Sequence, residues 1–192
     1  MASAADQHRL STPLGDDDVR GLRNGDRVLL TGEIYSARDA AHRRLVAALV
    51  SGDELPFPLD GAVIYYMGPS PARPGSPIGA AGPTTSYRMD PYAPALYEAG
   101  VKATIGKGAR GPEVRRALQR CTALYLAAIG GAGALLARTV QSAEVIAYPE
   151  LGPEAVRRLV VKDFPAVVVN DVFGGDLYES SLRPGGPEGE DE

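Results

Sequence analysis

The sequence contains few of the residues that form disulfides and metal sites. Its 192 residues include one cysteine, Cys121, and only two histidines, His8 and His42. A single thiol cannot form an internal disulfide, so we expect a reducing, cytoplasmic compartment. Zinc and iron–sulfur sites need about four protein ligands each, so no metal site is expected from this chain alone. Cys121 itself is expected to be a small core residue rather than a nucleophile.

The sequence also lacks the features that mark membrane and nucleic-acid proteins. No apolar run approaches the roughly 20 residues that a membrane-spanning helix requires. Residues 1–18 lack the basic start and apolar centre of a signal peptide. The net charge is −4 and the isoelectric point is about 5.3, so no basic field attracts nucleic acid or an anionic membrane. We therefore expect neither as a partner.

The composition is that of one folded domain with polar ends. Hydrophobic residues make up 44% of the chain and charged residues 23%, which is ordinary for a globular protein. Residues 1–13 are polar and are predicted to be mobile. Residues 181–192 are rich in proline, glycine and acids, which predicts a disordered acidic tail. Residues 14–180 contain no repeat or long linker and are predicted to form a single domain.

Strand and helix patterns alternate along this domain. Branched and aromatic runs predict strands, and glycine, proline or serine at the start of a segment predicts a helix. Strands are expected at 27–36, 61–68, 101–108, 123–129, 143–151 and 164–174, and helices at 37–52, 111–121, 130–143 and 152–164. Ser36 is the expected N-cap of the first helix. This alternation predicts an α/β layered domain, with a mixed rather than a purely parallel sheet.

Two glycine-rich stretches differ from nucleotide-binding motifs at the positions that matter. In the Gly-Lys-Gly at 106–108, the lysine is followed by glycine, whereas a P-loop needs serine or threonine there. In the stretch at 130–136, Leu136 stands where a dinucleotide-binding turn needs a third small residue. Both departures disfavour nucleotide binding.

The first candidate cluster contains a cation at the start of a helix. Arg38 and Asp39 lie in the first turn of the helix expected at 37–52. The helix macrodipole favours an anion at that end, so an anion is expected to join Arg38. His42 lies one turn later on the same face. The alternative is a solvated arginine beside a structural histidine.

Two further clusters lie on loops and supply hydroxyls and cations. Thr84, Thr85 and Ser86 follow a Gly-Pro pair, and their hydroxyls and amides suit a carboxylate that Arg88 binds with both arms of its fork. Lys107 lies between glycines, which let a ligand approach the backbone. For the Thr84–Arg88 cluster, the alternative is a helix cap with an ion pair inside the chain. For Lys107, the alternative is a plain turn. Together the three clusters predict a site for a small dianion.

The motifs resemble the β subunit, or C-terminal half, of class I fumarate hydratases and L-tartrate dehydratases. The resemblance rests on TGEIYSARDAAHRRL, GAVIYYMGP, GPTTSYRMDPYAPALYEAGVKATIGKG and FPAVVVND, which follow one another between about residues 14 and 179. The combination of GPTTS-x-RMD with a downstream GKG is specific to this family. The resemblance implies a swivelling β/β/α domain that closes over an α portion.

The same resemblance implies a hydro-lyase that adds or removes water across a dicarboxylate. The family uses a [4Fe–4S] cluster whose cysteines lie in the α portion, in agreement with the single thiol of this chain. We therefore expect no cofactor on this chain alone, activity only with a separate α subunit, and a hetero-oligomer such as α2β2.

The resemblance also carries residue roles onto this sequence. It implies that Arg38, Arg88 and Lys107 bind substrate carboxylates, with Lys107 also catalytic. Thr84 resembles the residue proposed as the general base, although a threonine hydroxyl is too weak a base without electrostatic help. His42 is implied to support the binding residues, as is the motif's Asp39.

Fumarate and malate are the favoured substrates. Tartrate enzymes of the family carry cysteines at the positions that Ala37 and Ala41 occupy here. An L-tartrate dehydratase β subunit and a non-catalytic dicarboxylate-binding module remain as alternatives.

Overall fold

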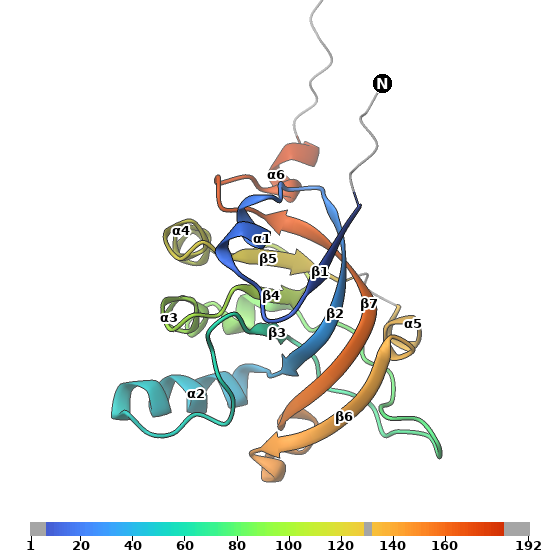
Figure 1. The fold of residues 1–192 in the computed structure, drawn as a ribbon. Coiled ribbons are helices and arrows are strands. Elements are labelled where there is room, and N and C mark those ends of the chain that lie inside the picture. Colours follow the sequence, from blue (N-terminus) through green and yellow to red (C-terminus); the bar gives the residue numbers. More distant parts are fainter. Residues whose placement is uncertain (1–6, 129–131, 183–192) are drawn as a thin grey trace, which may run out of the picture.

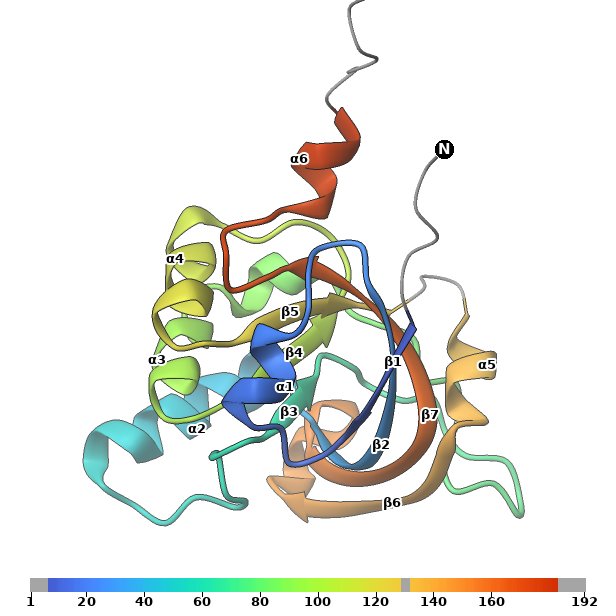
Figure 2. The same ribbon diagram turned by 45° about the horizontal axis from the view of Figure 1, so that its top comes forward.

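The computed structural model describes residues 7–128 and 132–182. Within them, seven strands form one mixed sheet. In order of contact these are β1 (Gln7–Ser11), β2 (Arg27–Ser36), β3 (Val63–Tyr65), β4 (Ala103–Gly106), β5 (Leu124–Ala127), β7 (Val156–Asn170) and β6 (Val140–Ala147). β1 to β5 are parallel neighbours, whereas β7 runs antiparallel to β2, β5 and β6. Because β7 pairs with both β5 and β2, the sheet closes on itself (Figures 1 and 2).

Helices cover one side of the parallel strands. These are α2 (Asp39–Ser51), α3 (Ala93–Glu98) and α4 (Pro112–Arg120). They stack on one side of β3, β4 and β5, and β6 and β7 lie on the other side (Figure 1). Shorter elements are α1 (Asp16–Arg20), α5 (Gly133–Ala137), α6 (Leu177–Leu182) and the 3-10 helices η1 (Ser86–Met89) and η2 (Pro149–Glu154). The predicted α/β layered domain with a mixed sheet is confirmed.

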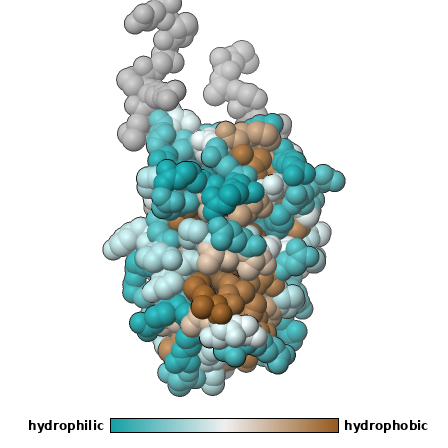
Figure 3. Space-filling view, turned by 90° about the vertical axis from the view of Figure 1, so that its left-hand side faces the viewer, coloured by the Kyte–Doolittle hydropathy of each residue, from teal (hydrophilic) through white to brown (hydrophobic). Residues whose placement is uncertain are grey.

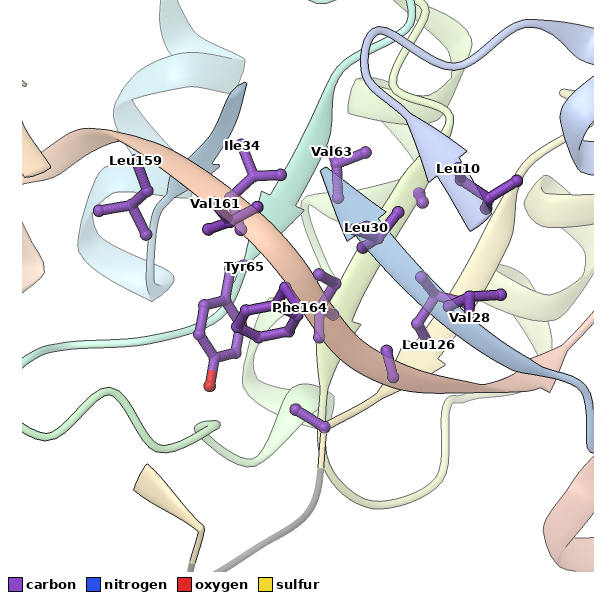
Figure 4. Packing of buried hydrophobic residues seen from close by; sticks show 14 of the residues in the cluster. Leu10, Val28, Leu30, Ile34, Val63, Tyr65, Leu126, Leu159, Val161 and Phe164 are labelled. Atoms are coloured by element: carbon purple, nitrogen blue, oxygen red, sulfur yellow. The ribbon is translucent and has the colours of Figure 1, made fainter. Parts of the chain in front are cut away.

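The hydrophobic core has two parts, one on each face of the parallel strands. Side chains alternate between the faces along a strand. Val63 and Tyr65 therefore lie inside the closed sheet, whereas Ile64 packs under the helices. Figure 4 shows the inner cluster, in which the rings of Tyr65 and Phe164 meet edge-on with centroids 5.2 Å apart. A strand buried on both faces needs apolar residues at every position, which explains the unbroken run at 61–68.

The outer face of the helices is mostly hydrophilic, and one of its hydrophobic patches is larger than the rest. Figure 3 shows this patch in the lower half of the face, at the level of α2. The inner side of α2 carries the fully buried Leu45, and its last turn carries Val50, which is 85% exposed. In the described part of the chain, no helix has both the length and the apolarity of a membrane span.

The helix predicted at 152–164 is wrong. These residues form the end of η2 and the first half of β7. Val156, Leu159 and Val160 have helical spacing, but Leu159 pairs with β2 on one side and with β6 on the other. Pairing along both edges outweighs a weak local preference for helix. The helix predicted at 130–143 is shorter than expected, because β6 begins at Val140.

The N-terminal segment differs in part from the prediction of mobility over residues 1–13. Gln7–Ser11 form β1, which pairs with β2, and the side chain of Leu10 is buried. Only one of its five residues is apolar, so its sequence gives little indication of a strand. The strand forms because it pairs with β2. The predictions for residues 1–6 and 183–192 concern segments outside the described residues, and the domain boundaries stay a prediction.

Candidate functional site

The candidate residues gather at one edge of the sheet, where β2, β3 and β4 end. Arg38 follows β2, Tyr66 follows β3 and Lys107 follows β4. These strands are parallel neighbours, so their carboxyl ends lie side by side. In α/β sheets and barrels, ligands commonly bind at the edge formed by the carboxyl ends of the parallel strands. The loop at 83–88 is tied to the same edge by a bridge between Thr85 and Lys107.

The two arginines meet on one carboxylate. Nη2 of Arg88 donates to Oδ2 of Asp39 at 2.9 Å, and Nη2 of Arg38 lies 3.8 Å from Oδ1 of the same residue. The side chain of Arg88 is 41% exposed and that of Arg38 is 20% exposed. The structure thus brings together Arg38 and Arg88, which lie 50 positions apart in the sequence, with Asp39 between them.

A second carboxylate, that of Glu154, joins this group. Its Oε1 lies 3.1 Å from Nη2 of Arg38, and its Oε2 accepts the backbone N–H of Ala40 at 3.2 Å. The expected N-cap, Ser36, ends β2 instead, and Arg38 occupies the N-cap position without a side-chain cap of its own. Arg38 therefore lies beside two carboxylates of the chain itself, those of Asp39 and Glu154. Sequence reasoning missed Glu154, because it lies in the segment predicted as a helix.

His42 is a buried, neutral support for Arg38. Its Nδ1 lies 2.9 Å from the carbonyl oxygen of Arg38. A carbonyl only accepts, so Nδ1 carries the proton and Nε2 does not. The ring packs edge-on against Tyr66, with centroids 5.1 Å apart. Burial lowers the pKa of His42 to about 4, so it carries no charge at neutral pH.

The buried His42 is expected to make stability depend on pH. Its pKa lies below the unfolded value of 6.5, so the unfolded chain binds the proton first as the pH falls. His42 should contribute no pH dependence above pH 6.5 and should cost roughly 3 kcal/mol of stability between pH 6.5 and pH 4. Denaturant unfolding of wild type and His42→Asn across this range measures the difference in slope. A variant with the wild-type slope would assign the pH dependence to other groups.

The backbone of Lys107 is held by a ring of hydrogen bonds around Ser86. The N–H of Ser86 donates to the carbonyl of Lys107 at 2.9 Å, and the N–H of Lys107 donates to Oγ of Ser86 at 3.1 Å. The hydroxyl of Tyr125 donates to the carbonyl of Gly108 at 2.7 Å. The Ser86 hydroxyl is therefore the donor in its 2.9 Å bond to Tyr125. A Cβ at position 106 would overlap that hydroxyl, which explains the glycine there.

Ser86 differs from the other predicted substrate-binding residues in its burial and in its hydrogen bonds. Ser86 is fully buried beneath the loop, whereas Lys107 is exposed and has no ion-pair partner among the described residues. Thr84 and Thr85 are half-buried, and neither hydroxyl has a hydrogen-bond partner within the described part of the chain. Lys107, Thr84 and Thr85 thus keep polar groups available to a ligand, and Ser86 holds their loop in place.

A buried ion pair that sequence reasoning also missed lies behind these loops. The Nε of Arg110 donates to Oδ1 of Asp90 at 2.7 Å, and its Nη1 donates to the hydroxyls of Tyr66 and Thr104 at 3.3 and 3.2 Å. The guanidinium also faces the ring of Tyr125, 4.9 Å from its centroid. Asp90 follows the loop that carries Arg88, and Arg110 follows the loop of Lys107. The pair therefore ties the two loops together.

The chain does not offer ligands for the iron–sulfur cluster that the resemblance implies. No group of three or more histidine, cysteine, aspartate or glutamate residues in the described segments could hold a metal ion. The one thiol of the whole sequence, Cys121, follows α4 and precedes β5, so it lies at the opposite edge of the sheet. Burial raises the pKa of this thiol. A [4Fe–4S] cluster therefore does not fit this chain.

Comparison with known proteins gives consistent matches. The family model described as Fumarase C-terminus matches residues 2–181. The chain is 40% identical over 159 residues to the anaerobic class I fumarate hydratase of Escherichia coli K12, and 39% identical over 161 residues to fumarate hydratase 2 of Leishmania major. Each match covers 82% of this chain and 29% or 28% of the relative. The chain thus spans less than a third of these relatives.

A shorter relative is matched over most of its length. The chain is 38% identical over 168 residues to the "Putative L(+)-tartrate dehydratase subunit beta" of Methanocaldococcus jannaschii. This match covers 84% of the chain and 86% of that relative.

Proposed function

The chain belongs to the Fumarase C-terminus family, and on that premise we propose that it is the β subunit of an iron–sulfur hydro-lyase that interconverts fumarate and L-malate. The relatives named as fumarate hydratases support the reaction. The relative named as a subunit beta supports the division into subunits.

The observation that carries the proposal is the group of cations at one sheet edge. Three cations from different segments of the chain lie at the edge where the parallel strands end: Arg38, Arg88 and Lys107. A dicarboxylate carries two negative charges, and a guanidinium binds a carboxylate through two parallel hydrogen bonds. Two arginines therefore suit its two ends, and Lys107 adds a third positive charge.

The hydroxyls on the neighbouring loop suit the reacting part of the substrate. The backbone N–H of Thr84 donates to the carbonyl of Tyr66, and Thr85 forms a bridge with Lys107. The hydroxyls of both threonines have no hydrogen-bond partner among the described residues. In the proposed enzyme Thr84 receives the proton of the reacting carbon. This role requires that the pKa of its hydroxyl falls far below the ordinary value, because a free alcohol is a weak base.

The iron–sulfur cluster belongs to another polypeptide in this proposal. The chain supplies cations and hydroxyls, and a cysteine-bearing α subunit supplies the cluster ligands, in an assembly such as α2β2. This division agrees with the single cysteine of the sequence. The swivelling movement implied by the resemblance would bring the cationic edge over the α subunit.

L-tartrate dehydration is the second candidate. It is favoured by the relative that the chain matches over most of both lengths, which is named as a tartrate dehydratase subunit. Ala37 and Ala41, the positions at which tartrate enzymes carry cysteines, are fully buried in the core. In this proposal a residue at either position affects the substrate only indirectly, through the packing at the start of α2. A non-catalytic dicarboxylate-binding module is the third candidate.

Reconstitution tests the proposal. The chain alone should show no hydration of fumarate, and it should become active when combined anaerobically with a cysteine-bearing α polypeptide that co-purifies from the native host. Assays with fumarate and L-tartrate side by side distinguish the two hydro-lyases. Full turnover by the isolated chain would refute the subunit role. Tight calorimetric binding of fumarate without any partner would favour the binding module.

A further inference from the structure

The contact between Glu154 and Arg38 joins two segments that are remote in the sequence. Glu154 lies 114 residues beyond Ala40, whose amide it also binds. We propose that Glu154 is a positioning residue: its carboxylate holds the Arg38 guanidinium in the orientation that binds a substrate carboxylate, without touching the substrate. The effect of Glu154 on catalysis rests on the proposed function. Its effect on the orientation of Arg38 does not.

The two oxygens of Glu154 fix it to the start of α2. Oε1 contacts Nη2 of Arg38 at 3.1 Å, and Oε2 accepts the N–H of Ala40 at 3.2 Å. α2 has 13 residues and no side-chain cap from its own N-cap residue. A carboxylate at this end satisfies a free amide and lies favourably in the helix dipole. The guanidinium is thus held to a carboxylate that the helix itself fixes.

The segment that carries Glu154 is itself held in place. Arg157 donates three hydrogen bonds to the carbonyls of Gly152, Pro153 and Ala155, at 2.9, 3.0 and 3.1 Å. Gly152 has a positive φ of 57° and turns the chain just before Glu154. The carboxylate is therefore presented by a fixed backbone rather than by a free loop.

Arg38 lies in a narrow space between this segment and the end of β3. A Cβ at Gly68 would lie 3.1 Å from the carbonyl oxygen of Pro153 and 3.2 Å from Nη1 of Arg38. Glu154 contacts Nη2 only. Nε is buried without a hydrogen-bond partner, and Nη1 has no partner among the described residues, so Nη1 remains as a donor for a second carboxylate. Glu154 can therefore hold Arg38 in place without competing with the substrate for it.

The neighbouring Glu150 provides a matched control. It lies four residues before Glu154, on the other side of the turn at Gly152, and it pairs with Arg44 of α2, the helix whose N-cap is Arg38. Both side chains of that pair are more exposed than those of Arg38 and Glu154. Glu150→Gln therefore removes a carboxylate from the same segment and leaves Arg38 untouched.

The structural part is tested on the full chain alone. Hydrogen exchange of the Arg38 Nε–H is measured by NMR, with the signal identified by its loss in Arg38→Lys. In Glu154→Gln the exchange should accelerate at least tenfold, because the guanidinium is no longer fixed. Glu150→Gln should exchange at the wild-type rate. Wild-type exchange in Glu154→Gln would overturn the inference.

The catalytic part is tested in the reconstituted complex. Glu154→Gln should raise KM for fumarate at least tenfold with kcat within about threefold of wild type, because binding to Arg38 is shared by ground and transition states. Glu154→Asp keeps the charge and should recover part of the loss, and Glu150→Gln should behave as wild type. An unchanged KM would show that Glu154 does not affect substrate binding, and a lowered KM would show that Glu154 competes with the substrate for Arg38. Either result overturns the inference. If the wild-type complex does not hydrate fumarate, the proposed function fails, and the exchange measurement alone decides the role of Glu154.

Discussion

Asp90→Ala is expected to lower the free energy of unfolding by about 3–5 kcal/mol, because it leaves the buried Arg110 guanidinium without its counter-ion. The Arg110 side chain is 0% exposed, and its Nε lies 2.7 Å from the Asp90 carboxylate. The other oxygen of Asp90 accepts the N–H of Gly111 at 2.7 Å, where α4 begins. Denaturant unfolding of the full chain, followed by circular dichroism, measures the change.

Two further variants separate the buried charge from a general effect of mutation. Asp90→Ala combined with Arg110→Met removes both charges and should recover most of the stability, because an apolar replacement of a whole buried pair is often neutral. Glu98→Gln breaks the exposed pair with Arg120 and should cost less than about 1 kcal/mol. If Asp90→Ala costs no more than Glu98→Gln, Arg110 does not depend on its partner.

Arg88→Lys is expected to have the largest effect on activity. In the proposed complex with an α subunit it should reduce kcat/KM for fumarate hydration roughly 30- to 1,000-fold, which corresponds to about 2–4 kcal/mol of lost transition-state binding. Lysine keeps the charge but replaces a planar fork with a single point of donation. Because the side chain of Arg88 is 41% exposed and pairs with Asp39 at the surface, the fold should remain intact.

The control for this prediction is an arginine in a comparable exposed pair away from the cationic edge. Arg120, in the last turn of α4 at the opposite edge of the sheet, pairs with Glu98, so Arg120→Lys should leave the kinetics unchanged. Thermal unfolding of both variants checks that the domain is intact. Wild-type kinetics in Arg88→Lys would remove Arg88 from the substrate-binding site.

Elements with a strong local pattern could be predicted from the sequence. The strand at 27–36 coincides with β2, and the helix predicted at 37–52 corresponds to α2, which ends at Ser51 and is followed by Gly52 as its C-cap. Gly52 adopts a left-handed conformation with φ of 71°, the conformation that glycine accepts at a helix end. The apolar run at 61–68 likewise needed only its composition to indicate a buried strand.

Elements that depend on their neighbours could not be predicted. β1 and the first half of β7 carry weak or helical local patterns, and both are strands because β2 pairs with them. The start of α2 shows the same limit. Ser36 has the better capping side chain, but β2 continues to that residue and the cap comes from Glu154.

The candidate site divides in the same way. The residue types in the motifs were sufficient to predict Arg38, Arg88 and Lys107 as cations for a dianion, because charge and loop chemistry are properties of short segments. Only the tertiary structure brought these cations to one edge, since that depends on the parallel order of β2, β3 and β4. It also decided which groups hold them: Glu154 beside Arg38, and the Asp90–Arg110 pair behind the loops. Such contacts join segments far apart in the chain, and a local pattern carries no record of a partner that only folding supplies.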